Sequence, residues 1–210
     1  MADSTRYTSK LASSRVLIIG GTSGIGFAVA SACLESGALV TISSSNASRV
    51  ASAVQKLQTT YPSKTANIHG LTVDLSQAAT LEHELKTLLD GTVSQIGGAG
   101  KKLDHVVFTA GDALAMIPLA DMTMQTLLQA GQIRFFAPLM LAKYLPAYLE
   151  PSYKSSYTIT TGAVSEKPIP NWSVIGSYAG GHHSMVRNLA LDLKPLRVSR
   201  LALFLRPWVC

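Results

Sequence analysis

Seven residues near the start of the chain, Gly20-Gly21-Thr22-Ser23-Gly24-Ile25-Gly26, have the composition and spacing of a phosphate-binding turn. They follow the apolar run Val16-Leu17-Ile18-Ile19 and precede the apolar stretch 27–34. This order predicts a buried strand, a tight turn and a buried helix. In such a turn the glycines let the backbone approach a diphosphate, while the N–H groups of the first helical turn point at the anion. The alternative is a glycine-rich turn that binds no ligand.

The segment after the second apolar run indicates which dinucleotide the turn would hold. The run Leu39-Val40-Thr41-Ile42-Ser43 continues into Ser44-Ser45-Asn46-Ala47-Ser48-Arg49, which contains no acid. An acid at this point would bind the ribose hydroxyls and repel a 2′-phosphate. Hydroxyl groups, an amide and a guanidinium suit a phosphate dianion instead. We therefore expect NADP(H) rather than NAD(H), the alternative being a polar loop that caps the next helix.

Apolar runs and helical stripes alternate along the chain and define the elements that must position these residues. The alternation predicts an α/β fold, a Rossmann-like doubly wound parallel sheet in three layers with six or fewer strands. Strands are expected near 15–20, 39–43, 68–73, 104–109, 156–161 and 197–204. Helices are expected near 24–36, 47–59, 77–89, 122–148 and 176–193, and the glycine-rich stretch 97–100 is expected to be a loop.

The length and composition fit one globular domain. Of the 210 residues 47% are hydrophobic and 14% are charged, which suits a sheet covered on both faces. We expect a single domain over 1–210, with a flexible N-terminus at 1–13 and an atypical tail at 199–210. The net charge of +6 is scattered and does not form the basic stripe of a nucleic-acid-binding protein.

Further features of the sequence bear on the compartment. Cys33 and Cys210 give no disulfide framework, and the polar start is not a signal peptide. No apolar run reaches the roughly 18 residues of a membrane span. We expect a cytoplasmic protein that binds a small-molecule substrate, without nucleic acid, membrane or metal as a partner.

The G-x-x-x-G-x-G spacing, together with Tyr178 in Gly176-Ser177-Tyr178-Ala179-Gly180-Gly181-His182, resembles the short-chain dehydrogenase/reductase family. The resemblance covers the chain from about Ser14 to Val198. It implies hydride transfer between a nicotinamide and a carbonyl or alcohol carbon. It also implies that Asp74 accepts from the adenine amino group, although Asp74 would equally suit the N-cap of the next helix. Thr109-Ala110-Gly111 resembles the family's turn that leaves room for the cofactor, with Thr109 in place of an asparagine.

In this family a tyrosine exchanges the proton and a lysine four residues later binds the ribose and lowers the tyrosine pKa. An unassisted tyrosine has a pKa of about 10, so proton exchange at neutral pH needs adjacent positive charge. Tyr178 is the candidate acid, and its ring would also lie beside the cofactor. His182 stands where the lysine should be, on the same helix face. A neutral imidazole could bind the ribose hydroxyls, but it is a poor permanent cation.

Two further positions of the family's site are altered. The strand end points to Thr161 as the hydroxyl that binds the substrate oxygen, whereas the usual separation from the tyrosine points to Ser165. We favour Thr161, because the loop 166–172 resembles an insertion. The family's asparagine aligns with Arg134, whose guanidinium could lower the Tyr178 pKa, hold a cofactor phosphate or polarise a substrate carbonyl. The alternative is a structural ion pair with an acid.

These departures, with Trp172 in a proline-rich loop, resemble a divergent fungal branch used in secondary metabolism that includes bifunctional reductase/Diels–Alderases of indole alkaloid pathways. We expect an NADP(H)-dependent reductase of a small, largely apolar carbonyl or iminium metabolite, with Trp172 as an apolar wall or, alternatively, a core residue. Iminium reduction needs a hydride but no proton on the partner atom, so the altered relay would be tolerated. The alternatives are a pericyclase or isomerase that keeps NADP(H) as a scaffold, and a catalytically impaired nucleotide-binding relic.

The end of the chain departs from the family as well. The sixth strand should lead to a Pro-Gly turn, a helical lid and a final strand, whereas the sequence continues from Ser199 to Cys210 without them. We interpret this as a C-terminal truncation that leaves a sheet edge unpaired. The resemblance also implies a homodimer or homotetramer that pairs through the helices flanking the fifth strand.

Overall fold

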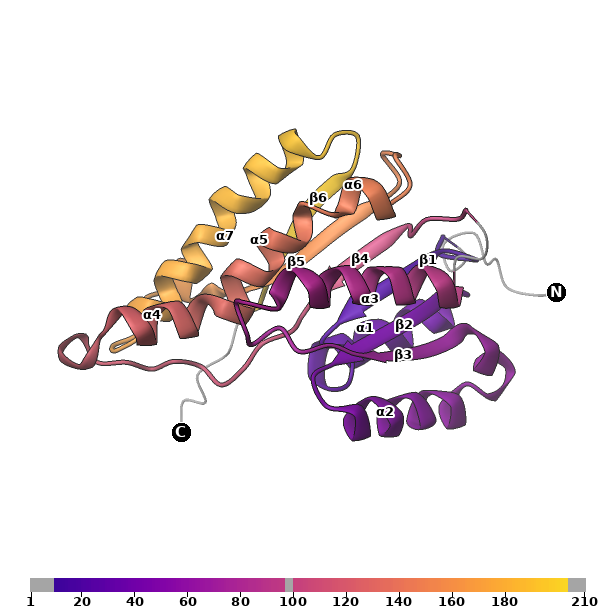
Figure 1. The fold of residues 1–210 in the computed structure, drawn as a ribbon, viewed down its shortest axis with the longest axis horizontal. Coiled ribbons are helices and arrows are strands. Elements are labelled where there is room, and N and C mark those ends of the chain that lie inside the picture. The colour runs from indigo at the N-terminus through magenta and orange to yellow at the C-terminus, as the bar shows by residue number, and fades with distance from the viewer. Residues whose placement is uncertain (1–9, 97–99, 204–210) are drawn as a thin grey trace.

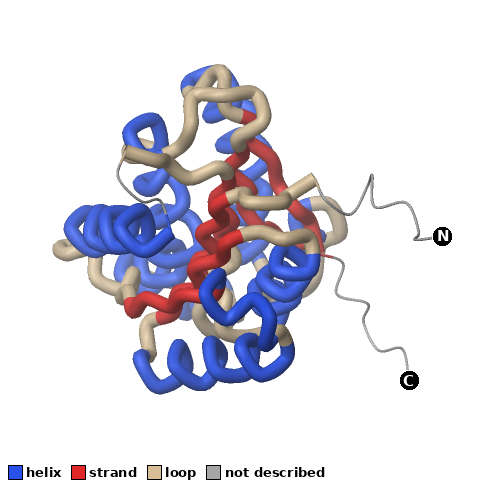
Figure 2. Tube along the Cα trace, turned by 90° about the vertical axis from the view of Figure 1, so that its right-hand side faces the viewer, coloured by secondary structure: helices blue, strands red, loops and turns tan. Residues whose placement is uncertain are grey.

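A parallel sheet with helices on both faces forms the centre of the molecule (Figures 1 and 2). The structure, a computed structural model, describes residues 10–96 and 100–203. Within these residues six parallel strands lie in the order β3-β2-β1-β4-β5-β6. They are β1 (Arg15–Ile19), β2 (Leu39–Ser44), β3 (Ile68–Thr72), β4 (His105–Phe108), β5 (Ser156–Gly162) and β6 (Arg197–Leu203). The predicted Rossmann-like, three-layered α/β fold is confirmed.

Helical segments connect the strands. The α-helices are α1 (Gly24–Glu35), α2 (Ala47–Thr60), α3 (Leu81–Ile96), α4 (Met124–Gly131), α5 (Ala137–Ala142), α6 (Leu145–Tyr148) and α7 (Ser173–Asp192). Short 3-10 segments are η1 (Pro62–Asn67), η2 (Leu119–Asp121) and η4 (Ala163–Ser165), and η3 (Gln132–Phe136) is a π-helical segment. Figure 2 shows the strands as one layer with helices on either side.

Alternate residues of β1 face opposite sides of the sheet. Val16 and Ile18 lie in the core under α1 and α2, whereas Leu17 and Ile19 lie in the core under α3, α5 and α7. All four are at most 1% exposed. This double burial explains why the strand is a continuous apolar run and not an alternating pattern.

The strand predictions are confirmed to within one residue at either end. Residues 199–203, assigned from sequence to an atypical tail, complete β6 and pair with β5. The residues 1–9, 97–99 and 204–210 lie outside the described part of the chain. The expected flexible N-terminus, the glycine-rich loop and the last part of the tail fall largely on them.

Three helices differ from the prediction. Helix α3 begins at Leu81 instead of 77 and continues to Ile96, and α7 begins at Ser173 instead of 176. The single helix expected at 122–148 is wrong, because it is divided into α4, η3, α5 and α6.

A proline accounts for the break between α4 and α5. Pro138 has no N–H to donate to the carbonyl of Arg134, four residues earlier, and its ring crowds that carbonyl. The chain accommodates the proline with a π-helical segment at Gln132–Phe136, a widening that often occurs at functional sites.

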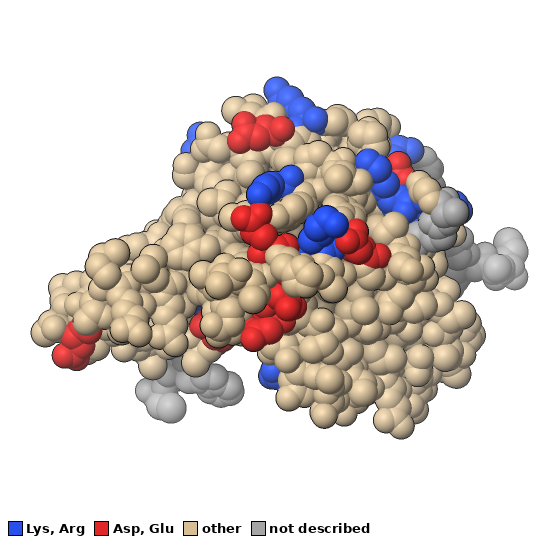
Figure 3. Space-filling view, viewed as in Figure 1, with Lys and Arg blue, Asp and Glu red and all other residues tan. Residues whose placement is uncertain are grey.

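Charged side chains are distributed unevenly over the surface. In Figure 3 they gather over α3, α5 and α6, where Lys143 Nζ lies 2.6 Å from Glu82 Oε2 and Lys86 Nζ lies 3.3 Å from Asp90 Oδ2. The projection at the left, which contains α4, is almost free of charge. Between residues 114 and 128 the large exposed apolar side chains are Leu114, Met116, Leu119, Met124 and Leu128.

Within the described ranges, each helix is too short or too polar to span a bilayer.

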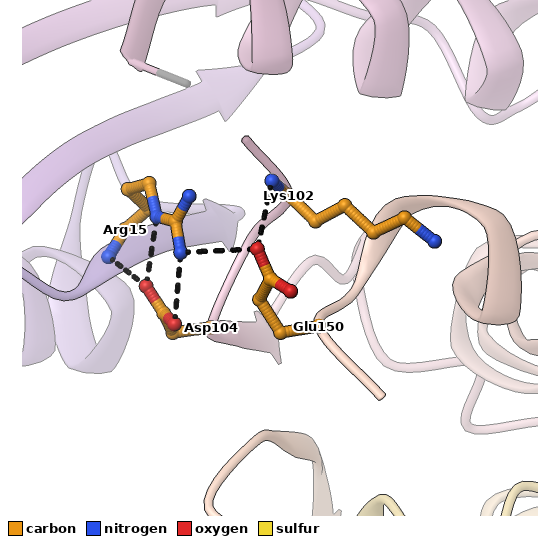
Figure 4. Close-up of polar contacts among 4 residues, drawn as sticks. All are labelled: Arg15, Lys102, Asp104 and Glu150. Atoms are coloured by element: carbon orange, nitrogen blue, oxygen red, sulfur yellow. Dashed lines mark hydrogen bonds and ion pairs between the residues drawn. The ribbon is translucent and has the colours of Figure 1, made fainter. Parts of the chain in front are cut away.

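An ionic network ties the amino-terminal ends of the strands together (Figure 4). Arg15, at the start of β1, donates from Nε and Nη2 to both carboxylate oxygens of Asp104, at 2.9 and 3.1 Å. Its backbone N–H donates to the same carboxylate at 2.8 Å. Glu150 accepts from Arg15 Nη2 at 3.4 Å and from the backbone N–H of Lys102 at 3.2 Å. The network therefore joins β1 to the segments that precede β4 and β5.

We expect Asp104→Asn to lower the free energy of unfolding by about 1–2 kcal/mol, because it weakens charged hydrogen bonds to a half-buried guanidinium. Burial alone would raise the pKa of Asp104, but hydrogen bonds and charge from Arg15 lower it below its usual value. The stabilisation is therefore complete above the pKa of the unfolded chain and is lost as pH falls through the lower, folded value. Denaturant unfolding at several pH values measures this.

The control is Lys86→Gln, which breaks an exposed ion pair within α3 and should cost about 0.5 kcal/mol or less. Equal losses for the two variants, or a loss for Asp104→Asn that persists in acid, would contradict the proposed contribution of the network.

Candidate functional site

A cleft of about 280 Å³ opens where β1, β2, β3 and β4 end. Nearly all residues selected from sequence for cofactor binding line it. These are Gly20, Thr22, Ser23, Gly24, Ile25, Gly26, Ser44, Ser45, Arg49, Asp74, Thr109, Ala110 and Gly111. The cleft lies where the strand order reverses between β1 and β4, the position at which open α/β sheets bind their ligands.

The turn after β1 is in very close contact with the end of β4. Gly20 has a φ of +88°, and a Cβ on it would lie 2.5 Å from the backbone nitrogen of Ala110. A Cβ on Gly26 would lie 2.5 Å from Thr109 Oγ1 and would also overlap the Gly20 carbonyl. The Thr109 hydroxyl is placed to donate to the carbonyls of Ile19 and Gly20, at 3.0 and 3.1 Å. Its role in this structure is therefore to hold the two turns together.

The N-terminus of α1 is prepared for an anion. Ser23, at the N-cap, makes no side-chain capping hydrogen bond, and no acid occupies the first turn. The first backbone N–H groups of a helix have no partner within it, and the helix dipole adds partial positive charge there. The helix of twelve residues thus presents free donors to the cleft, which fits the diphosphate of a dinucleotide.

The end of β2 and the first turn of α2 provide hydroxyls and a cation. Arg49 Nη2 lies 3.3 Å from Ser45 Oγ, and Ser44 lines the same cleft. The Asn46 side chain accepts from the backbone N–H of Arg49 at 2.9 Å and caps α2. Asn46 is therefore used by the helix, whereas the other three side chains are available to a ligand.

Asp74 follows β3 at the edge of the cleft. Its carboxylate accepts from the backbone N–H of Ser76 at 2.9 Å. It is not the N-cap of α3, which begins seven positions later at Leu81. The exposed carboxylate keeps acceptor capacity on the side where an adenine would lie.

A second groove adjoins the cleft and adds positive charge. It has a volume of about 490 Å³, lies between α1 and α2, and includes both Arg49 and Lys56. Lys56 Nζ lies 5.1 Å from the centre of the Phe27 ring. Arg49 and Lys56 therefore both lie at the groove beside the glycine-rich turn and add positive charge there.

The two adjacent histidines of α7 each contact one of the alternative hydroxyl candidates. His182 Nδ1 lies 3.2 Å from Thr161 Oγ1, which also reaches the Ala179 carbonyl at 3.1 Å. His183 Nε2 lies 2.9 Å from Ser165 Oγ. Thr161 is only 7% exposed, so of the two hydroxyls Ser165 is the more accessible.

His182 is buried and bridges three elements. Its Nε2 lies 2.8 Å from the Arg134 carbonyl, which can only accept, so Nε2 carries the hydrogen. Nδ1 is then an acceptor that faces the Thr161 hydroxyl, whose single hydrogen also reaches the Ala179 carbonyl. Burial lowers the pKa of His182, although the hydrogen bond to Arg134 opposes this. The ring is therefore neutral near pH 7 and joins α7, β5 and η3.

Tyr178 points into an aromatic cluster. Its hydroxyl donates to the Leu127 carbonyl of α4 at 2.8 Å, and its ring centre lies 5.1 Å from that of Phe135 and 6.0 Å from that of Phe136. Burial raises its pKa. Tyr178 and His182, like Asn46, were selected from sequence for cofactor binding but are not among the residues that line the cleft.

Arg134, in η3, is not among the residues that line the cleft, but its guanidinium lies against Gly111, which does line it. Its Nε donates to Asp112 Oδ1 at 3.0 Å, and its Nη2 donates to the Asp112 carbonyl. The guanidinium lies over Gly111, where a Cβ would come within 2.7 Å of Nη1. Arg134 is thus paired with an acid, the alternative considered from sequence, yet its side chain remains 34% exposed.

Sequence reasoning missed some residues of the site. Asp112 directly follows a selected glycine, but nothing in the sequence connects it with Arg134, 22 positions away. Ile133, in η3, also lines the cleft. Pro138, which interrupts the expected helix five residues later, was the feature of the sequence that could have indicated its position. Trp172, selected as a substrate wall, lies half-buried at the N-cap of α7 and is not among the residues that line the cleft.

Comparison with known proteins gives consistent matches. Residues 7–205 match the family model of an SDR-like Rossmann domain. The short-chain dehydrogenase/reductase fsr5 of Gibberella fujikuroi is 45% identical over 203 residues, 96% of this chain and 75% of that protein. Its counterpart malC of Malbranchea aurantiaca is 40% identical over 95% of this chain and 74% of the relative. The solved MalC reductase/Diels–Alderase superposes with a TM-score of 0.85 at 39% identity, covering 94% of this chain and 74% of MalC.

We expect Gly26→Ala to weaken dinucleotide binding at least about tenfold, because the new methyl group overlaps backbone at the contact of the two turns. Calorimetric titration with NADPH measures this. Gly180→Ala is the matched control, since a Cβ at Gly180 of α7 meets nothing within 4 Å. Unchanged binding by Gly26→Ala would show that the turn does not hold the ligand.

Proposed function

Because this chain belongs to the short-chain dehydrogenase/reductase family, we propose that it is an NADP(H)-dependent reductase of a small, largely apolar carbonyl or iminium metabolite. Rossmann domains of this family bind nicotinamide cofactors. The observation that carries the proposal is the cleft in which the uncapped N-terminus of α1 faces the ends of β2 and β4. When bound there, the cofactor would supply or accept a hydride at its nicotinamide ring.

The preference for NADP(H) is supported by the groups around the ribose position. Ser44, Ser45 and Arg49 line the cleft, and Lys56 lies in the adjoining groove. Hydroxyls and a guanidinium bind a phosphate dianion through charge-assisted hydrogen bonds. The acid that lines the cleft, Asp74, follows β3 and not β2, so no carboxylate at the end of β2 opposes a 2′-phosphate.

We expect Arg49→Gln to weaken NADPH binding about tenfold and to leave NADH binding nearly unchanged, because the lost cation acts only on the 2′-phosphate. Titration of the soluble protein with each dinucleotide tests this. Arg187→Gln, which removes an exposed cation of α7, is the control. An equal loss for NADH would assign Arg49 to another part of the cofactor.

The preference for an iminium substrate is supported by the surroundings of Tyr178. A carbonyl becomes an alcohol by taking a hydride on carbon and a proton on oxygen. An iminium takes only the hydride and becomes a neutral amine. The Tyr178 hydroxyl is bound to the Leu127 carbonyl and burial raises its pKa, so it can protonate a ketone oxygen only after this hydrogen bond breaks, whereas an iminium needs no proton and suits the site better.

We expect Tyr178→Phe to lower the kcat for a ketone about a hundredfold, the usual range for a lost acid, and to change the reduction of a cyclic iminium less than about threefold. Loss of NADPH absorbance with a matched ketone and an N-methylated cyclic iminium measures both rates. Tyr153→Phe, at a side chain that is 71% exposed, is the control. An equal fall for both substrates would contradict the division of roles.

A second function, a pericyclase or isomerase that keeps NADP(H) as a scaffold, is also supported. The raised pKa of Tyr178 and the name of MalC, a reductase/Diels–Alderase, favour it. Product formation at constant NADPH absorbance would support this function, and stoichiometric consumption of NADPH would exclude it. Failure to bind NADPH would leave only the third alternative, a catalytically impaired relic, and catalysis of any kind would exclude that alternative.

Location and assembly belong to the same proposal. We expect a cytoplasmic protein that acts on a small molecule, and a homodimer or homotetramer that pairs through α5, α6 and α7. Exposed Leu139 of α5 and Leu191 of α7 support pairing on these faces.

A further inference from the structure

Arg134 is held at two points by residues of different elements. Its carbonyl accepts from His182 Nε2 at 2.8 Å, and its guanidinium pairs with Asp112 through Nε and Nη2. Pro138 removes the N–H that would normally reach that carbonyl in an α-helix. The histidine therefore satisfies a backbone acceptor that the proline leaves without its usual donor, and the aspartate fixes the side chain.

The pairing leaves part of the guanidinium unused. An arginine has five N–H donors in a rigid plane, and Asp112 takes one from Nε and one from Nη2. Among the described residues, Nη1 has no hydrogen-bond partner, and it lies against Gly111 at the rim of the cleft. The free edge is thus a preoriented donor site next to the end of β4.

We propose that Asp112 and His182 are positioning residues that fix Arg134, so that its free edge binds an acceptor oxygen of the substrate beside the carbon that takes the hydride. The substrate class is then an iminium or carbonyl compound that carries a carboxylate or carbonyl oxygen next to that carbon. The substrate part rests on the proposed reductase function, whereas the positioning of Arg134 does not.

The burial of His182, Arg134 and Asp112 supports the proposed roles, in which His182 holds the backbone and Asp112 holds the Arg134 side chain. His182 is 4% exposed and holds only the backbone, while the side chains of Arg134 and Asp112 are 34% and 36% exposed at the rim. An ion pair at such exposure contributes little to the free energy of unfolding, so stability alone does not account for it. A fixed donor fork costs less entropy when it captures a planar acceptor than a free arginine does.

The first test is independent of activity. We expect the Arg134 Nε–H signal of arginine-labelled protein, assigned by its loss in Arg134→Lys, to exchange with water about tenfold faster in Asp112→Asn and in His182→Leu. His182→Gln, whose amide can donate to the carbonyl and accept from Thr161, should restore slow exchange. Asp121→Asn and His83→Gln, both exposed, are the controls. Unchanged exchange in Asp112→Asn and His182→Leu would overturn the positioning role.

The second test concerns the substrate oxygen. With pyrroline-carboxylate and methyl-pyrroline as probes, we expect Asp112→Asn to raise the KM of the carboxylate at least about tenfold, with little change for the methyl compound or for NADPH affinity. A weaker NADPH affinity would assign the donor edge to the cofactor, and equal effects on both probes would exclude an oxygen site. If the unaltered protein reduces neither probe, the reductase proposal and the oxygen site both fail, while the exchange measurement still decides the positioning of Arg134.

Discussion

The close contact between the turn after β1 and the end of β4 is the constraint on which the rest of this structure depends. Backbone at Gly20 and Gly26 approaches Thr109 and Ala110 so closely that a methyl group has no room. The Thr109 hydroxyl links the two turns by reaching two carbonyls of the first. The contact requires β1 and β4 to be neighbours, and that neighbourhood creates the reversal of strand order where the cleft opens.

The same packing explains which parts could be predicted from sequence. Strands β1 and β2 are buried on both faces and therefore appear in the sequence as nearly continuous apolar runs, and all six predicted strands agree with the structure to within one residue at either end. The cleft followed from the glycine spacing and from the rule that strand ends meet at one edge. Asp74 was correctly placed in the cleft, but its capping alternative was wrong, because the start of α3 had been placed four residues too early.

What could not be predicted depends on contacts across long sequence separations. A proline within an otherwise helical pattern does not say whether the chain kinks, ends or widens, so the π-helical segment was missed. The partner of Arg134 and the direction of the Tyr178 hydroxyl depend on how η3 and α4 then lie against α7 and Gly111. Motif spacing identifies which residues belong to the site, but it cannot show which of their polar atoms are already used by a neighbour.

If His182 and Arg134 stand where the family has lysine and asparagine, as the resemblance implies, the two replacements are physically connected. At position 182 the side chain is almost fully buried between a hydroxyl and a carbonyl, where a permanent cation would carry a large desolvation cost. A neutral imidazole can accept from the first and donate to the second, and so meets both requirements without charge. The positive charge instead lies on Arg134, at the rim, where water and Asp112 solvate it. The two side chains are directly connected, since the histidine holds the backbone carbonyl of the residue from which the guanidinium extends.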